Sequence, residues 1–106
     1  MNYTVDITDA ALTDLDEIYN HIRFVFRAPD TAAAQYDRIA DAILSLEELP
    51  LRFPVAQFEP CISARLHRMP VDNYSVFYLV RETRVIVTDV LYSASDLEMR
   101  LGIRHE

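Results

Sequence analysis

The chain has 106 residues, 51% of them hydrophobic, and its ten basic and seventeen acidic residues give a net charge of −7. This length and apolar content predict one folded domain over residues 1–106 and exclude wholesale disorder. Every basic residue is Arg. The negative balance argues against direct nucleic-acid binding by the free protein, because phosphate contacts normally leave a basic footprint.

The cysteine count and the start of the chain indicate a cytoplasmic protein. Cys61 is the single cysteine, which excludes an internal disulfide framework and fits a reducing compartment. The opening "MNYTVDIT" lacks the basic start and apolar core of a secretory signal. No apolar run approaches the roughly 18 residues that a membrane span needs, so we expect no membrane contact.

The first half of the chain predicts a strand followed by a helical hairpin. Residues 3–8 alternate apolar and polar side chains, as a half-buried strand does. A helix follows as far as Val25, with apolar side chains every three or four residues and Thr8 or Asp9 as its N-cap. Pro29 interrupts this helix, because proline lacks a backbone N–H and disfavours the helical conformation at the residue before it. A second amphipathic helix starts there, which makes an antiparallel helical hairpin.

The second half predicts a meander of three strands. Residues 62–67 alternate, with Ser63, Arg65 and His67 on the polar face. Residues 74–80 are apolar on almost both faces, and residues 85–92 form the third strand. The order β-α-α-β-β-β-(α) predicts an α+β fold in which a helical hairpin packs on a small, mainly antiparallel sheet.

The third strand and the segment after it support two further predictions. A short closing helix is expected, with Ser93 or Ser95 as its cap and Gly102 as its stop. Within the strand, strict alternation places Asp89 on the same face as apolar neighbours. An isolated buried carboxylate is costly, so we expect Asp89 to pair with an arginine. The neighbours that share this predicted face are Val85, Val87 and Leu91.

Neither a metal site nor a cofactor is indicated. The three histidines and Cys61 lack the spacing of metal ligands, and Cys61 has no obvious base beside it. Gly102 is the only glycine, which excludes a glycine-rich phosphate loop. We therefore expect no cofactor and no metal.

Polar side chains gather at one rim of the predicted sheet. An arginine there can hold a phosphate through two hydrogen bonds, and a tyrosine or histidine can move a proton during attack by a 2′-hydroxyl. The same side chains also fit an ordinary polar strand end without chemistry. They are Arg65, His67 and Arg68 from the first meander strand, Ser75 from the second, and Tyr92, Ser93, Ser95 and Asp96 after the third.

The stretches "ARLHRMPVDNYSVFYLV" and "VIVTDVLYSASDLEMRL", with the opening "YTVDIT", resemble the RelE/ParE superfamily of bacterial toxins. The resemblance spans nearly the whole chain. It implies the toxin of a type II toxin–antitoxin module, which inhibits growth, serves plasmid stabilisation and is neutralised by a cognate antitoxin. RelE-like members cleave messenger RNA on the ribosome with basic side chains and often a tyrosine, whereas ParE-like members bind and inhibit DNA gyrase.

Residue by residue, the resemblance favours the ParE-like branch. Arg68 falls where RelE-type toxins have a catalytic lysine, but Ser75 and Ser95 stand where those toxins have arginines. Leu101 stands near the place of their C-terminal tyrosine. The tail is closer to ParE-type toxins and keeps Asp96, although Tyr92 and Ala94 replace a usual His and Arg.

Three hypotheses about function remain open. The first is a toxin that binds a target such as gyrase through Arg65, Arg68, Tyr74, Tyr92 and Asp96. The second is a divergent, ribosome-dependent mRNA interferase with Arg65, His67, Arg68 and Tyr92 as catalytic candidates. The third is a degenerate, non-toxic homologue that still binds its antitoxin. A chain at −7 repels an acidic segment unless its arginines cluster, so we expect a neutral or arginine-bearing antitoxin segment with apolar anchors.

Overall fold

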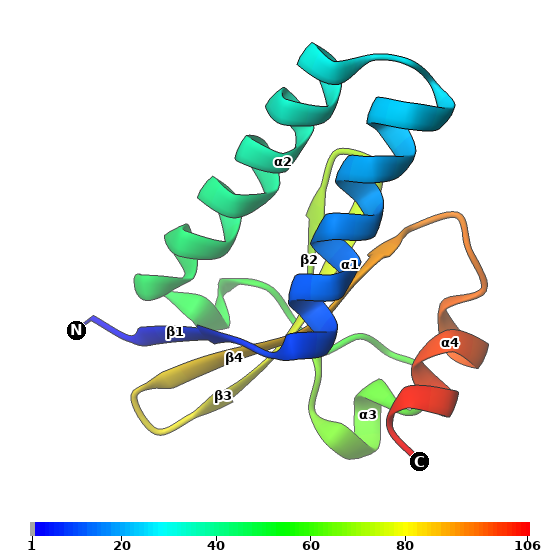
Figure 1. The fold of residues 1–106 in the computed structure, drawn as a ribbon. Coiled ribbons are helices and arrows are strands. Elements are labelled where there is room, and N and C mark those ends of the chain that lie inside the picture. The colour runs from blue at the N-terminus through cyan, green and yellow to red at the C-terminus, as the bar shows by residue number, and fades with distance from the viewer. Residues whose placement is uncertain (1) are drawn as a thin grey trace.

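The computed structural model describes residues 2–106 and shows a four-stranded sheet with helices on both faces (Figure 1). The predicted α+β class and helical hairpin are confirmed. The sheet order is β1-β4-β3-β2, with β1 parallel to β4 and the other two pairs antiparallel. The elements are β1 (Thr4–Ile7), α1 (Asp9–Asn20), a π-helical turn (His21–Val25), α2 (Pro29–Leu44), 3-10 turns (Ser45–Glu47 and Pro50–Arg52), α3 (Cys61–Ala64), β2 (His67–Val71), β3 (Tyr74–Arg81), β4 (Arg84–Tyr92) and α4 (Leu97–Arg104).

The helical hairpin forms where its capping residue and its proline predict it. The Thr8 side chain accepts a hydrogen bond from the Ala11 N–H and caps α1. The π-helical turn extends α1, and Pro29 opens α2 at a position where its missing N–H costs nothing. The hairpin covers one face of the sheet, and the buried residues between them form the main core: Ala11, Leu15, Ile39, Ile43, Leu46, Met69, Val76, Tyr78, Val85, Val87 and Val90.

A bulge in β4 redistributes its side chains between the two faces. Phe77 pairs with Asp89 and Tyr78 pairs with Val87, which leaves Thr88 without a partner on β3. One extra residue turns the following side chains to the opposite face. The prediction that Asp89 shares a face with Val85 and Val87 is therefore wrong. Those two valines lie in the core under the hairpin, whereas Leu91 belongs to a second core with Phe77, Cys61, Leu66, Leu97 and Leu101.

The strand predicted over residues 62–66 is absent. Cys61–Ala64 instead form one helical turn that ends at Arg65 in the left-handed conformation, with φ 58°. The Leu66 N–H closes the turn by donating to the Cys61 carbonyl. In this turn Cys61 and Leu66 are buried and Ile62 is exposed, so the short alternation did not report a strand. β2 begins only at His67.

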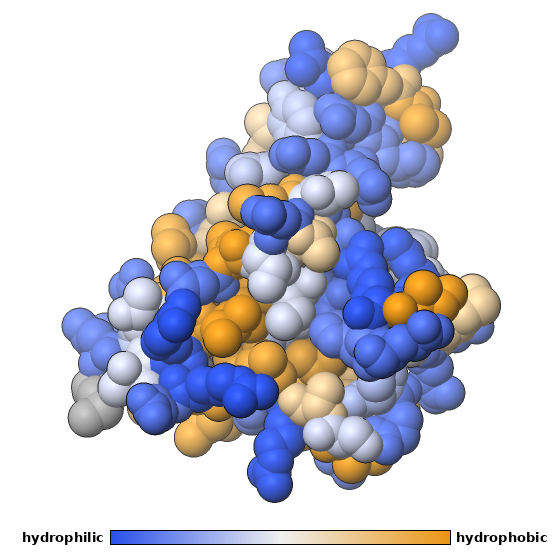
Figure 2. All heavy atoms as spheres, turned by 60° about the horizontal axis from the view of Figure 1, so that its bottom comes forward, coloured by the Kyte–Doolittle hydropathy of each residue, from blue (hydrophilic) through white to orange (hydrophobic). Residues whose placement is uncertain are grey.

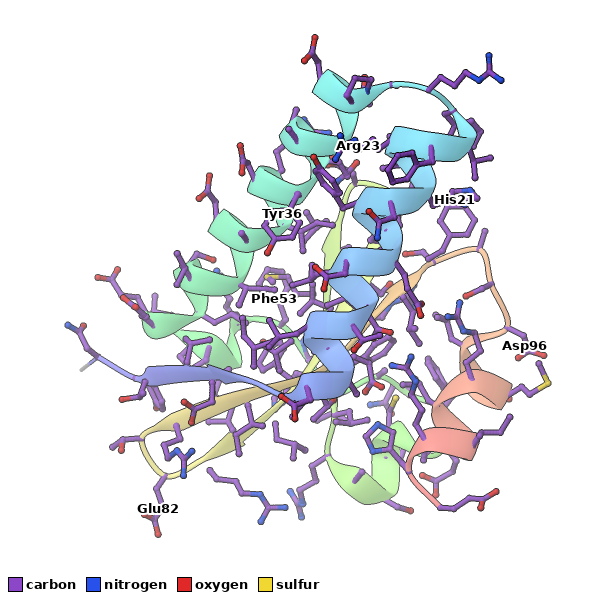
Figure 3. All side chains as sticks on the ribbon, in the orientation of Figure 1. His21, Arg23, Tyr36, Phe53, Glu82 and Asp96 are labelled. Carbon is purple, nitrogen blue, oxygen red and sulfur yellow. The ribbon has the colours of Figure 1, made fainter. Side chains whose placement is uncertain are left out.

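The closing helix also starts and ends differently. Asp96, rather than Ser93 or Ser95, caps α4 by accepting a hydrogen bond from the Met99 N–H, and Gly102 lies inside the helix. Figure 3 shows Asp96 at the start of α4, far from Glu82 at the tip of the β3–β4 hairpin. Within residues 2–106, no helix combines the length and apolar character that crossing a membrane requires.

Candidate functional site

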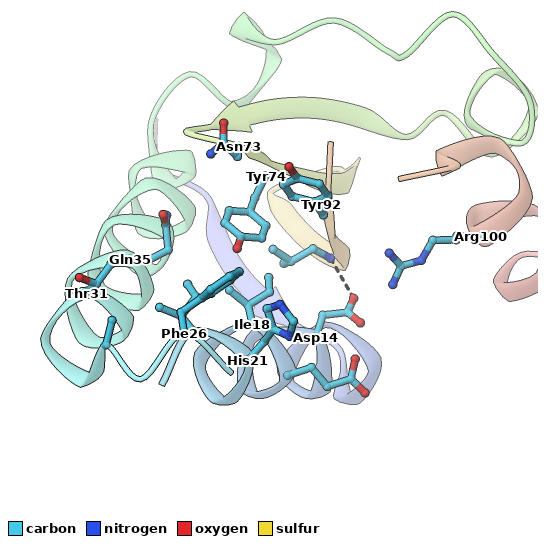
Figure 4. A pocket seen from close by; sticks show the side chains of 14 residues that line it. Asp14, Ile18, His21, Phe26, Thr31, Gln35, Asn73, Tyr74, Tyr92 and Arg100 are labelled. Atoms are coloured by element: carbon cyan, nitrogen blue, oxygen red, sulfur yellow. Dashed lines mark hydrogen bonds between the residues drawn. The ribbon is translucent and has the colours of Figure 1, made fainter. Parts of the chain in front are cut away.

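A groove of about 750 Å³ opens between the helical hairpin and the end of the sheet where β4 finishes (Figure 4). The hairpin contributes one wall and the strand ends contribute the other. Its apolar and aromatic lining residues are Ile18, Ile22, Phe26, Ala28, Tyr74, Val90 and Tyr92, and its polar ones are Asp14, Glu17, His21, Thr31, Gln35, Asn73 and Arg100. The groove is therefore amphipathic, as sites for partner segments are.

Two tyrosines form the aromatic centre of the strand wall. Tyr74 and Tyr92 are paired across β3 and β4, and their rings meet edge to face with centroids 5.8 Å apart. Burial, and then the neighbouring Tyr92, raise the pKa of Tyr74 above its usual value. Tyr74 thus stays protonated at neutral pH and suits hydrogen bonding or packing better than proton abstraction.

The hairpin wall is fixed to the sheet by polar contacts. The Asp72 carboxylate in the β2–β3 turn accepts hydrogen bonds from Gln35 at 3.0 Å and Arg38 at 2.8 Å, both in α2. The bond from Arg38, and then that from Gln35, lower the pKa of Asp72. This contact joins α2 to the β2–β3 turn beside the groove, which Gln35 also lines.

A buried ionic network lies behind the groove. Asp14 accepts hydrogen bonds from the Val90 N–H at 2.9 Å and from Arg104, which also donates to Asp89 at 3.0 Å. His105 contacts the other oxygen of Asp89 at 2.8 Å. The hydrogen bond to Asp14 is the main cause that raises the pKa of Arg104, so the guanidinium stays charged. The ion pair expected for Asp89 is confirmed.

Part of the predicted polar rim assembles on the sheet face that carries α4. The Arg68 Nε donates to the Ser75 hydroxyl at 2.9 Å, and that hydroxyl lies 2.7 Å from the Ser93 hydroxyl. Ser75 is fully buried. Arg68 is thus committed to a partner inside the protein, and Ser75 serves as its acceptor.

His67 and Arg65 do not join this cluster. His67 lies on the hairpin side of the sheet, where its ring stacks on Tyr78 at 5.1 Å. Its Nδ1 lies 2.7 Å from the Phe53 carbonyl, which can only accept, so Nδ1 carries the proton. The predicted place of His67 on a polar face is wrong, because β2 alternation puts His67 beside buried Met69. Arg65 lies in the turn before β2.

The sequence-predicted binding residues therefore separate. Tyr74 and Tyr92 line the groove, Asp96 caps α4, Arg68 bonds to Ser75, and Arg65 lies at the far end of the sheet. Asp14 and Arg104 were not among the predicted site residues. A signal for Asp14 was present, since it falls inside the apolar stripe of α1 between Ala11 and Leu15.

No cluster of three or more His, Cys, Asp or Glu side chains suited to a metal occurs among the described residues. Cys61 is fully buried. Burial, followed by the charge of Asp89, raises the pKa of the Cys61 thiol to about 11, so this thiol stays protonated and is a poor nucleophile.

Comparison with solved structures identifies the same fold in known toxins. The chain superposes on the chromosomal ParDE toxin–antitoxin system from P. aeruginosa with a TM-score of 0.71 and 16% identity, covering 85% of this chain and 95% of that one. The toxin–antitoxin complex RelBE2 from Mycobacterium tuberculosis gives a TM-score of 0.61 and 21% identity, with 87% and 99% covered. A mutant of the E. coli toxin RelE in the free state gives 0.66 and 12%, with 99% and 98% covered.

Sequence similarity identifies the family of the chain. No curated protein sequence matches the chain significantly. The sequence model described as "ParE toxin of type II toxin-antitoxin system, parDE" matches residues 5–97, which is most of the chain. The protein therefore belongs to the ParE toxin family of type II toxin–antitoxin systems.

Proposed function

We propose that this ParE-family toxin acts in the cytoplasm by binding and inhibiting a protein target such as DNA gyrase, and that a cognate antitoxin neutralises it. Growth inhibition and plasmid stabilisation follow from such a pair. One observation carries the proposal: an open aromatic groove presents Tyr74 and Tyr92, while the groups expected for RNA cleavage are held apart.

The separation of these groups counts against phosphate chemistry. Cleavage by a 2′-hydroxyl needs a base, an acid and a cation within hydrogen-bond reach of one phosphate. His67 faces the hairpin side, whereas Arg68 bonds to Ser75 on the other face. The net charge of −7 further disfavours an approach to RNA.

The groove also suits an antitoxin segment. The P. aeruginosa, M. tuberculosis and Pyrococcus horikoshii structures that share the fold are toxin–antitoxin systems or complexes. We propose that an antitoxin segment places apolar anchors against Tyr74 and Tyr92. Glu17 on the hairpin wall favours a segment that is neutral or carries arginine, whereas the charge of Asp14 is already neutralised by Arg104. Such a segment would mask the groove from the target.

The experiment compares two activities of one purified sample. We expect the toxin to inhibit supercoiling by gyrase, to leave ribosome-bound mRNA intact, and to lose the inhibition when antitoxin is added. Cleavage of mRNA with supercoiling untouched would contradict the proposal. Absence of any growth defect on induced expression, with antitoxin binding retained, would instead identify a degenerate homologue.

The interferase alternative has its own discriminating variant. The double substitution Arg65→Gln and Arg68→Gln removes both cations that such a nuclease would use. We expect it to leave growth arrest intact, once circular dichroism shows that it folds, because neither arginine lines the groove. Loss of growth arrest in a folded double variant would favour the nuclease.

A further inference from the structure

β3 is longer than β2, the strand that pairs with it at the edge of the sheet. β2 pairs with β3 only from Tyr74 to Tyr78, and His67 opposite Tyr78 is the last partner. Leu79–Arg81 therefore have β4 on one side and, among residues 2–106, no strand on the other. The cause is local, since the left-handed Arg65 turns the preceding chain into α3 instead of along β3.

The backbone of this uncovered segment, Leu79–Arg81, is free to pair. Both neighbouring hairpins have two-residue turns, closed by Val71 with Tyr74 and by Arg81 with Arg84. The two residues that close such a turn are hydrogen-bonded to each other, and the backbone N–H and C=O then point to alternate sides along the strand. From either turn, this alternation points the N–H and C=O of Val80 away from β4. Neither group hydrogen-bonds to the loops within residues 2–106. An edge N–H and C=O of this kind form a template for an added strand.

A hollow of about 750 Å³ runs beside the uncovered segment. Leu51, Val55 and Leu79 give it an apolar floor. Figure 2, which brings the bottom of Figure 1 forward, shows hydrophobic surface exposed between hydrophilic stretches on this side of the molecule. Because a strand added at an edge points alternate side chains in one direction, this floor would receive every second side chain of an incoming segment.

Two arginines give the hollow a local charge opposite to that of the protein. Arg65 and Arg81 line it, both are exposed, and neither forms an ion pair with another described residue. Glu82 is the one acidic residue in the lining. His67 also lines the hollow, and its Nδ1 is hydrogen-bonded to the Phe53 carbonyl. In a chain of net charge −7, this local excess of positive charge beside a free edge favours an acidic occupant.

We propose that the uncovered segment Leu79–Arg81 is a second docking site, which takes an extended acidic segment of a partner polypeptide as an additional strand. Apolar side chains of that segment contact Leu51 and Leu79, and its carboxylates contact Arg65 and Arg81. The site lies away from the Tyr74–Tyr92 groove, so this proposal does not depend on whether the groove binds a target.

The test uses the full chain and a short capped peptide that alternates glutamate and valine. On titration we expect amide exchange at Val80 to slow, with chemical-shift changes at Leu79 and Arg81. A peptide with lysine in place of glutamate should bind more weakly. The glutamate peptide N-methylated at alternate amides should not protect Val80, because it cannot complete the strand pairing.

Matched variants separate charge from edge pairing. Arg65→Gln combined with Arg81→Gln should weaken binding roughly two- to twentyfold, as expected for two exposed ion pairs. Arg23→Gln on the hairpin removes one positive charge far from the site and should leave the affinity unchanged (Figure 3). Equal binding of the lysine peptide, or unprotected Val80 in the bound state, would overturn the proposal. Concentration-dependent protection of Val80 without peptide would overturn it as well, because a second copy of the chain would then be the occupant.

Discussion

Arg104 in the C-terminal helix α4 donates to both carboxylate oxygens of Asp14 in α1, at 2.6 and 2.7 Å. The same guanidinium donates to Asp89 in β4 at 3.0 Å. Both carboxylates are almost completely buried. One side chain therefore joins α4 to the helical hairpin and to the sheet, and neutralises charge that water cannot reach.

The first prediction concerns this arginine. Arg104→Gln should lower the free energy of unfolding by about 3–5 kcal/mol, because it leaves buried carboxylates without their cation. Urea denaturation near neutral pH measures the change. Arg84→Gln is the matched control, since Arg84 pairs with Asp6 at the surface and should cost no more than about 1 kcal/mol. Equal losses in the two variants would contradict a structural role for the buried network.

The second prediction concerns acid stability. Arg38 and Gln35 lower the pKa of Asp72 in the folded protein. A carboxyl group whose folded pKa lies below its unfolded value of about 3.9 stabilises the protein above that pH, and the stability is lost as pH falls through the folded value. Asp72→Asn should therefore flatten the fall of melting temperature with pH below about pH 5.

The control for this experiment is Asp37→Asn. Asp37 is also exposed on α2, but no hydrogen bond or ion pair joins its side chain to another described residue. Its replacement removes the same charge without breaking such a contact, so an equal change of slope in both variants would assign the effect to net charge alone. A wild-type slope in Asp72→Asn would show that the contact with Arg38 does not persist in solution.

The third prediction concerns Tyr78 in the main core. Its hydroxyl donates to the Pro50 carbonyl at 2.5 Å, and burial raises its pKa to about 12. Tyr78→Phe should destabilise the fold by about 1–2 kcal/mol, because the carbonyl loses its partner. The folded pKa exceeds the unfolded value of about 10, so this stability is present below pH 10 and lost as pH rises through the folded value. Unfolding curves between about pH 9 and 12 should converge for wild type and variant; parallel curves would contradict the assignment.

The sequence predicted those parts of the fold that rest on local signals. Thr8, Pro29 and the apolar stripes of the two helices act through nearby residues, so the hairpin follows from them directly. The α+β class follows from the order of the elements. The turn that ends at Arg65 was missed because residues 62–66 alternate without belonging to a strand.

The candidate site depends on information that is not local. The bulge at Thr88 turns Asp89 away from Val87, and no residue type near Thr88 marks it. The pairing of Asp14 with Arg104 spans almost the whole chain, so only the folded structure brings them together. His67 and Arg68 are adjacent in sequence, yet strand alternation places them on opposite faces. A rim of polar residues in the sequence therefore became two separate sets in space.

The last prediction concerns the groove and the cognate antitoxin. Tyr92 is 48% exposed, and its ring packs on Tyr74 at the centre of the strand wall. Aromatic side chains at the centre of an interface often contribute 2 kcal/mol or more. Tyr92→Ala should therefore weaken antitoxin binding by roughly thirtyfold, measured by calorimetry.

Met99→Ala provides the comparison for Tyr92→Ala. Met99 is 57% exposed, so it presents a similar apolar surface, but it lies on α4 and does not line the groove. If the antitoxin occupies the groove, Met99→Ala should change its affinity less than about twofold. If the two variants weaken binding equally, the antitoxin follows α4 instead. Because Tyr92 is already half exposed, its truncation leaves the main core intact, and unchanged melting temperatures would confirm that both variants report binding alone.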